Sequence, residues 1–440
     1  MQTATPSNAP APPADEDEYG PPDIRRRNFY AWIAYQFFYR IGWQFKMEST
    51  LMAGIVSYLA PSPAVMGLFT TLNTLGRNLS PLAAAPIVDR FRDKRRALLV
   101  FWGITTATWA ALTAYLWLPS AGIRAVSIWV FGFSYTLFFV FLGAASVAQG
   151  ALLGKIIPAG MRGRAMAVGM TLSGGINVGA IFLIYHVIRG GAFPEPRNYA
   201  LAFSLTVTFF LFAGLSLLLI RERPSEVQQR SLGLAASLRY FVKLGRENDN
   251  LRKLMLVNIT VGVLGSMLQF YTGYWREAGT MTPSALVMAT VFQVFWQSLS
   301  SSILGRVADS KGNRVVICSL LWIEVTIPVA AWVLGGWAPF RGHWEWYLGV
   351  YALVGLRFPL YQLLVNYLLE VVPQHDHAMA LGAVTTVQLV TAPAPLLFGA
   401  AAAWMGYPLA FMLGSAIGVY GAIAALRLQE VRVLPLRGAG

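Results

Sequence analysis

Long apolar stretches alternate with short polar joints along nearly the whole chain. Each stretch holds about 20 residues or more, which lets a helix cross a bilayer core of roughly 30 Å. We assign twelve of them, at roughly 29–59, 63–88, 97–118, 124–153, 164–188, 199–220, 252–275, 283–307, 315–337, 345–371, 378–404 and 407–426. In lipid, only helices satisfy their own backbone hydrogen bonds along such stretches. The pattern therefore predicts an all-α membrane protein with twelve transmembrane helices.

The amino-acid composition agrees with a membrane protein, and the distribution of Lys and Arg residues indicates its orientation in the membrane. Hydrophobic residues make up 56% of the 440 residues and charged residues 12%, against roughly 45–50% and 25% in soluble proteins. If both termini are cytoplasmic, 25 of the 34 Lys and Arg residues fall in cytoplasmic segments and 5 in external ones. This bias follows the positive-inside rule. We therefore expect an inner (plasma) membrane protein whose net charge of +14 serves topology and contact with anionic lipid, not nucleic acid binding.

A repeated loop relates the two halves of the chain. Residues 305–314 read GRVADSKGNR, and a degraded copy, APIVDRFRDK, lies 220 residues earlier at 85–94. Each copy lies between two apolar stretches. The same offset relates Pro63 to Pro283, at the start of the preceding stretch. An offset shared by both ends of one segment indicates an internal duplication.

The duplication divides the chain into two six-helix halves, at 28–220 and 251–427. A hydrophilic linker at 221–250 joins them, and its apolar residues recur at helical spacing, which predicts an amphipathic helix on the cytoplasmic membrane face. We expect the Ala/Pro-rich N-terminal tail at 1–27 to be disordered and cytoplasmic. Residues 428–440 are expected to form a cytoplasmic C-terminal tail.

The repeated loop resembles the signature loop of the major facilitator superfamily of transporters, between helices 2 and 3 and between helices 8 and 9. The second copy is nearly complete, whereas the first has Ala85 and the pair Arg92-Asp93 where the family has glycine. The resemblance covers about 29–426. It implies two pseudo-symmetric six-helix bundles around a central cavity that opens alternately to either side. It also implies a small-molecule substrate, a lipid bilayer, possible coupling to protons or another ion, and neither cofactor nor enzymatic activity; we expect a monomer.

In the implied arrangement, helices 1, 4, 7 and 10 line the cavity. Their polar residues become candidates for substrate binding, together with Arg77 near the middle of helix 2: Arg40, Gln44, Gln149, Asn258, Gln269, Arg357, Tyr361 and Gln362. The family's gating aspartates map onto Asp89 and Asp309, with Arg90 and Arg314 as neighbouring cations. Helix capping and short-loop packing are the alternative explanation for these four residues.

Within the predicted spans, six charged residues are expected near the middle of the bilayer, namely Arg40, Lys46, Glu48, Arg77, Glu324 and Arg357. A charge near the middle of the bilayer costs about 2.5–3.5 kcal/mol on the insertion scale, so such residues usually face a bundle interior or a water-filled pathway. Four cations against two acids leave a positive surplus, and a buried cation needs a partner. We hypothesise that an anionic group of the substrate supplies it. The alternative is internal pairing, in which Glu48 binds Arg40 or Arg77.

Proton coupling requires a carboxyl group that changes its protonation inside the cavity. Glu48 is the stronger candidate because its helix is expected to line the cavity. Glu324 lies as deep, on a helix that the family usually places at the periphery.

Other functions find less support in the sequence. The drug–proton antiporter branch carries an arginine three residues before a Gln-Gly pair on helix 4, where this chain has Ser146. Efflux of amphipathic compounds and a non-transporting receptor or assembly factor are kept as alternatives. Neither a phosphate-binding Gly-x-x-x-x-Gly-Lys loop nor a catalytic nucleophile–base set is present, which argues against ATP hydrolysis and an enzyme. His375 and His377 are set aside as an exposed loop pair, so no metal site is predicted.

Overall fold

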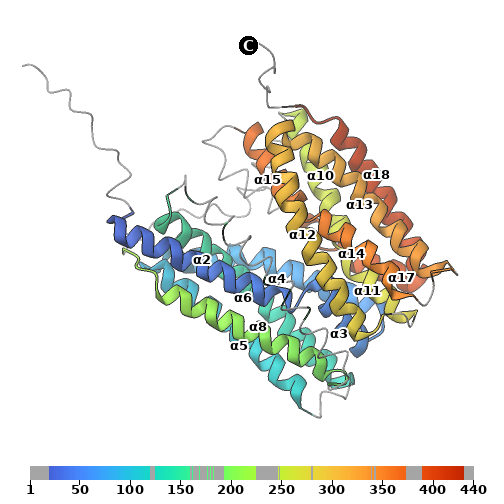
Figure 1. The fold of residues 1–440 in the computed structure, drawn as a ribbon, viewed down its shortest axis with the longest axis horizontal. Helices are drawn as coiled ribbons and strands as arrows, with labels where there is room; N and C mark the ends of the chain where they lie inside the picture. Colours follow the sequence, from blue (N-terminus) through green and yellow to red (C-terminus); the bar gives the residue numbers. More distant parts are fainter. Residues whose placement is uncertain are drawn as a thin grey trace, which may run out of the picture.

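The structure is a computed structural model that describes residues 19–118, 124–158, 193–223, 248–278, 281–337, 339–340, 343–372 and 389–430, with a few isolated positions. These segments are largely helical (Figure 1). The first half contributes α2 (Pro22–Gln44), η1 (Glu48–Met52), α3 (Ala53–Leu59), α4 (Pro63–Asp89), α5 (Lys94–Trp117), α6 (Arg124–Ile156) and α8 (Arg197–Leu218). The second half contributes α10 (Asp249–Gly265), α11 (Leu268–Glu277), α12 (Pro283–Lys311), α13 (Asn313–Gly336), η3 (Trp344–Trp346), α14 (Tyr347–Leu356), α15 (Leu360–Val371), α17 (Ala394–Met405) and α18 (Tyr407–Leu426).

Within the described segments, eight helices are long and apolar enough to cross a membrane. They correspond to predicted spans 3, 4, 6, 7, 8, 9, 10 and 12. The predicted spans 164–188 and the first part of 378–404 lie outside the described residues, as do most of the linker and the two tails. The chain is thus a multi-pass helical membrane protein.

Helix 1 differs from the sequence prediction of one unbroken helix over 29–59. Regular α-helix ends at Gln44, and the chain resumes at Glu48 as a five-residue π-helix before α3 begins. The backbone N–H of Met52 donates to the carbonyl of Met47, five residues earlier. Residues two apart do not face each other on a regular helix. The break removes that restriction, and so the prediction of one unbroken helix through Gln44 and Glu48 is wrong.

Helices 7 and 10 are interrupted as well. Helix 7 is split at Ser266 and Met267 into α10 and α11. Helix 10 is split between Leu356 and Leu360, where Pro359 lacks the N–H that a continuous helix would use. Membrane transporters often build their binding sites from such discontinuous helices.

Each half packs mainly upon itself. In Figure 1, α2, α5, α6 and α8 lie together, and α10, α13, α15 and α18 form a second group. The two groups repeat the same contacts. Asn28 at the start of α2 exchanges two hydrogen bonds of 2.9 Å with the backbone of Arg221, which follows α8. At the start of α10, Asn250 accepts a 2.9 Å bond from the backbone N–H of Gln429, which follows α18.

The two halves meet toward one end of the molecule, which we call the junction end: the end where α3 finishes, α4 begins and α11 finishes. Here η1 and α3 pack against α11, η1 also packs against α12, and α4 packs against α17. Ser49 donates to Gln293 at 2.6 Å, and the hydroxyls of Thr50 and Thr290 lie 2.6 Å apart. The opposite end, where α2 begins and α18 finishes, is called the terminal end. The cross-half hydrogen bonds of the described residues lie toward the junction end.

Candidate functional site

The break in helix 1 brings a lysine and a glutamate together inside the first half. Lys46 Nζ lies 2.6 Å from Glu48 Oε1, with the Lys46 side chain fully buried and Glu48 29% exposed. In the alternative of internal pairing, the expected partner of Glu48 was Arg40 or Arg77. The structure corrects this, because the kinked backbone lets two residues only two positions apart meet.

Two arginines belong to the surroundings of this pair, and Arg77 is within electrostatic range of Lys46. Both guanidinium groups and the Glu48 carboxylate are within electrostatic range of Tyr39. Arg40 is half-buried, and its Nε atom is buried without a hydrogen-bond partner. Arg77 is exposed in the middle of α4. Neither arginine forms an ion pair with any acidic residue in the part of the chain that the structure describes.

The structure adds polar residues that sequence reasoning missed. Tyr135 of α6 lies within electrostatic range of Glu48, and its hydroxyl accepts a 3.1 Å hydrogen bond from the Asn73 amide. Asn73 lies four positions before Arg77 on α4, so both are on one helix face. This spacing could have predicted from the sequence that Asn73 belongs to the same site as Arg77. The place of Tyr135 could not be read from spacing, since it depends on how α4 and α6 pack.

The second half holds its own buried pair. Arg357 Nη2 lies 2.6 Å from Glu324 Oε1, with Glu324 almost fully buried. The two groups form a close ion pair inside the second half. Arg357 follows the end of α14, at the break in helix 10. Its charge is therefore already balanced by the protein.

The remaining substrate candidates are dispersed. Gln44 and Asn258 are buried, and Gln269 is half-buried at the start of α11. The Gln149 side chain accepts a 3.3 Å bond from the Tyr35 hydroxyl, which ties α6 to α2. On α15, Tyr361 and Gln362 are exposed, and Gln362 donates to Asn366 on the same helix. The structure thus gathers Arg40, Arg77 and Glu48 from the predicted set, with Arg357 and Glu324 as a second group.

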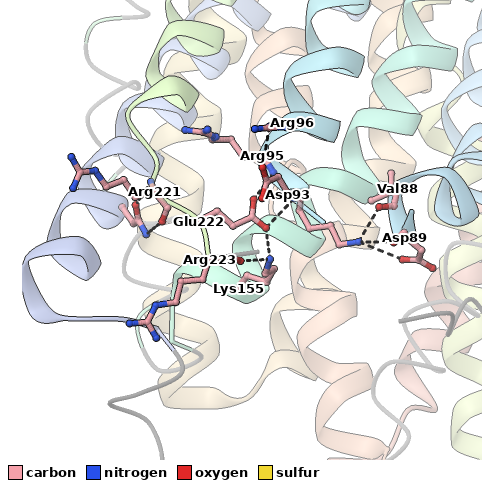
Figure 2. A network of polar contacts seen from close by, with 11 residues as sticks. Val88, Asp89, Asp93, Arg95, Arg96, Lys155, Arg221, Glu222 and Arg223 are labelled. Atoms are coloured by element: carbon pink, nitrogen blue, oxygen red, sulfur yellow. Dashed lines mark hydrogen bonds and ion pairs between the residues drawn. The ribbon is translucent and has the colours of Figure 1, made fainter. Parts of the chain in front are cut away.

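The predicted gating loop of the first half belongs to a charged network at the terminal end (Figure 2). Asp89 lies 4.0 Å from the ammonium of Lys94, which also donates to the Val88 carbonyl at 2.9 Å. Glu222, which follows α8, accepts the backbone N–H groups of Lys94 and Arg95 at 2.9 and 2.7 Å. It also pairs with the ammonium of Lys155 from α6.

This network repeats in part in the second half. Arg95 donates to the carbonyl of Leu218 at 3.4 Å, and Arg314 donates to the carbonyl of Leu426 at 2.8 Å. Arg90 is exposed, and the side chain of Asp309 lies outside the described part of the structure. Glu222 is the residue that sequence reasoning overlooked here. An acidic residue between two arginines, directly after an apolar span, could have identified Glu222 as a member of this network.

At the junction end, one ion pair joins the two halves. Arg276 of α11 lies 2.9 Å from Glu195 Oε1, and its other terminal nitrogen donates to Glu195 Oε2 at 3.2 Å. The Tyr199 hydroxyl accepts from Arg276 at 2.9 Å and donates to Glu195 at 3.0 Å. A cavity of about 210 Å³ beside this pair is lined by residues that include Ser57 and Arg124.

The described residues contain no group of three or more metal-ligating side chains. His375 and His377 lie outside them.

Comparison with known proteins identifies relatives of this arrangement. The family model described as Major Facilitator Superfamily matches residues 35–390. No curated protein sequence matches the chain significantly. Solved structures with a similar fold include the nucleoside transporter NupG, at 11% identity and a TM-score of 0.66 over 92% of this chain and 100% of that one. An auto-inhibited POT family peptide transporter has 14% identity and a TM-score of 0.66, over 95% and 99% of the two chains. The xylose transporter XylE from E. coli, partially occluded and inward open, has 13% identity and a TM-score of 0.64, over 95% and 100%.

Proposed function

Because the chain belongs to the major facilitator superfamily, we propose that it is a secondary active transporter that carries a small anionic or zwitterionic solute by alternating access. The structural neighbours named above are transporters of nucleosides, peptides and xylose. They support the transporter class. The preference for an anionic group comes from this chain's own charges.

The proposal of an anionic or zwitterionic solute is supported by the ion pairs that the charged residues form within the chain. The two acids expected near the middle of the membrane are each paired with one cation: Glu48 with Lys46, and Glu324 with Arg357. The other two cations, Arg40 and Arg77, are left without an acidic partner among the described residues. A half-buried cation such as Arg40 is stabilised by a counter-charge, and the exposed guanidinium of Arg77 is accessible to a solute. A carboxylate or phosphate on the solute supplies that charge, and guanidinium groups bind both in a bidentate manner.

The proposed site occupies the space between the two halves. Arg40, Arg77, Tyr135 and Asn73 form its first-half wall. Gln44 and Gln149 extend that wall, and Asn258, Gln269, Arg357, Tyr361 and Gln362 are the second-half candidates. Glu48 is the proposed proton-coupling carboxylate, with Glu324 as the second. The twelve-helix count and the two pseudo-symmetric six-helix bundles belong to this proposal.

Alternating access requires that one end be closed while the other opens. The contacts between halves at the junction end, including the Glu195–Arg276 pair, support a state closed at that end. On the positive-inside assignment, that end faces outward and the terminal end faces the cytoplasm. The loops containing Asp89, Arg90, Asp309 and Arg314 would then form the inner gate. They close it when the two halves rock together.

Neutralising either arginine tests the solute class. We expect Arg40→Gln and Arg77→Gln each to weaken binding of the best anionic solute by at least tenfold, because a charge-assisted hydrogen bond of about 1.5–3 kcal/mol is lost. The measurement is a thermal-shift screen of purified protein against anionic, neutral and cationic metabolites, followed by counterflow of the best compound in proteoliposomes. Arg40→Lys keeps the charge and is expected to retain part of the affinity.

The matched control is Arg252→Gln, at the start of α10, where the arginine is exposed and pairs with Asp249. It should leave binding of the anionic solute unchanged. Stabilisation by neutral or cationic amphipathic compounds alone would instead indicate the efflux alternative. Binding without counterflow would point to a receptor.

A further inference from the structure

Aromatic rings enclose the Lys46 ammonium. Its nitrogen lies 3.5 Å from the ring centroid of Trp43, 4.8 Å from that of Phe138, 5.1 Å from that of Phe139 and 5.4 Å from that of Trp109. The rings come from α2, α5 and α6. A desolvated cation over such a ring face gains about 2 kcal/mol. Three helices thus hold the ammonium in one place.

One polar group completes this enclosure. Glu48 Oε1 accepts a hydrogen bond from Lys46 at 2.6 Å, and the described residues offer that ammonium no other hydrogen-bond acceptor. Glu48 itself keeps 29% of its side-chain surface exposed. It therefore contacts a buried, fixed cation on one side and is open on the other. A carboxylate that receives a proton from a water-filled space needs this arrangement.

We propose that Lys46 is a positioning residue for proton coupling: its caged ammonium orients the Glu48 carboxylate and sets the pH range over which that group takes up a proton. This inference rests on the proposed function, in which Glu48 is the coupling carboxylate. It assigns a role to a charged residue that was not among the predicted substrate-binding, coupling or gating residues.

The neighbours of Glu48 explain why this lysine matters more than the two arginines. Tyr39 of α2, Arg77 of α4 and Tyr135 of α6 are charged or titratable groups within electrostatic range of Lys46 or Glu48, and Arg40 of α2 is within that range of Tyr39. A bound anionic solute neutralises Arg40 and Arg77. Lys46 then remains as the counter-ion in contact with Glu48. Solute occupancy and proton uptake are linked in this way, because filling the arginine site lowers the positive field around Glu48.

The test removes the ammonium while keeping the shape of its side chain. Lys46→Met leaves Glu48 without its counter-ion, and an opposite charge at this distance is worth about 1–3 pH units. We expect the midpoint of the pH dependence of transport to move up by that amount. Lys46→Arg keeps the charge and should stay closer to the unaltered protein. The same midpoints are measured without transport, from the infrared band of the protonated Glu48 carboxyl group, which is identified by its loss in Glu48→Gln.

The matched control is Lys253→Met, which removes a lysine that lies 2.5 Å from Asp249 at the start of α10, away from the site. It should leave both midpoints in place. If Lys46→Met also leaves both midpoints in place, Lys46 serves only packing and the inference is overturned. If the Glu48 band does not titrate in the unaltered protein while the anionic solute is still transported, the coupling role and this inference fail, and the solute assignment stands.

Discussion

At the scale of single residues, the function of this protein depends on which buried charges find partners within the chain. Glu324 and Arg357 satisfy each other, and Lys46 satisfies Glu48. The pairs differ in exposure. Glu324 is almost fully buried, whereas Glu48 keeps part of its surface open. A buried pair favours a structural role, and a half-open pair favours exchange with ligand or proton.

The Glu324–Arg357 pair predicts a stability effect of its own. Arg357→Gln should lower the free energy of unfolding by about 3–5 kcal/mol, because it leaves Glu324 buried without a counter-charge. The double variant Glu324→Gln/Arg357→Gln should recover most of that loss, since neither charge remains. Thermal unfolding of the purified protein in detergent measures both. A double variant as unstable as the single one would contradict the pairing argument.

At the scale of helices, interruptions determine where the charge pairs form, and glycines determine how closely two helices can pack. Helices 1, 7 and 10 are broken within their spans, and both charge pairs involve a residue at such a break. At the junction end, α4 and α17 cross with their backbones nearly in contact. A Cβ atom added at Gly399 would lie 2.4 Å from the carbonyl oxygen of Pro63, and one added at Gly67 would lie 2.3 Å from that of Pro395. Small residues permit such close crossings in lipid.

This crossing predicts a conformational effect. Gly399→Ala should force α4 and α17 apart and move the equilibrium away from the state closed at the junction end. Distances between spin labels placed across that end, one in each half, should lengthen on average. Gly103→Ala is the matched control, because a Cβ atom at Gly103 in α5 meets open space. Equal distance distributions in the two variants would show that the crossing can adjust without opening.

At the scale of the whole molecule, the two halves touch at the junction end, and the proposed function requires that contact to break and reform. Among the described residues, the Glu195–Arg276 ion pair bridges this contact, and opening at the junction end must break it. Arg276 is 14% and Glu195 21% exposed, and the two are joined through both terminal nitrogens of the guanidinium. A partly buried, bidentate pair of this kind is stronger than an exposed one.

Breaking this pair should favour the state open at the junction end. In a Cys318→Ser background, Ser57→Cys places a thiol in the cavity beside the pair. We expect Glu195→Gln to raise the rate of its modification by a membrane-impermeant reagent several-fold, since the ion pair no longer opposes opening. The charge-exchanged double variant Glu195→Arg/Arg276→Glu should restore a slow rate. Arg124→Gln is the control, because Arg124 lines the same cavity but lies over the Tyr58 ring without bridging the halves. The interpretation is wrong if Arg124→Gln accelerates modification as much as Glu195→Gln does.

Much of this architecture could be predicted from the sequence, because it depends on local properties of the chain. The length of an apolar stretch decides whether a helix can span lipid, and the duplicated loop signals two related halves. The spans assigned to α4 and α18 begin at the residues where those helices begin. The charged residues inside the spans could also be identified from the sequence, because their position within an apolar stretch is a local property.

Only the tertiary structure decided which of those charges are free. A helical wheel assumes an unbroken helix, and helix 1 breaks where Lys46 turns back to Glu48. The pairing of Arg357 with Glu324 depends on how helices 9 and 10 pack, which hydrophobic periodicity does not specify. The sequence by itself therefore determined that this protein is a helical membrane protein with surplus positive charge inside its predicted spans. The fold decided that the surplus falls on Arg40 and Arg77, because electrostatic partners are chosen by distance in space and not by spacing along the chain.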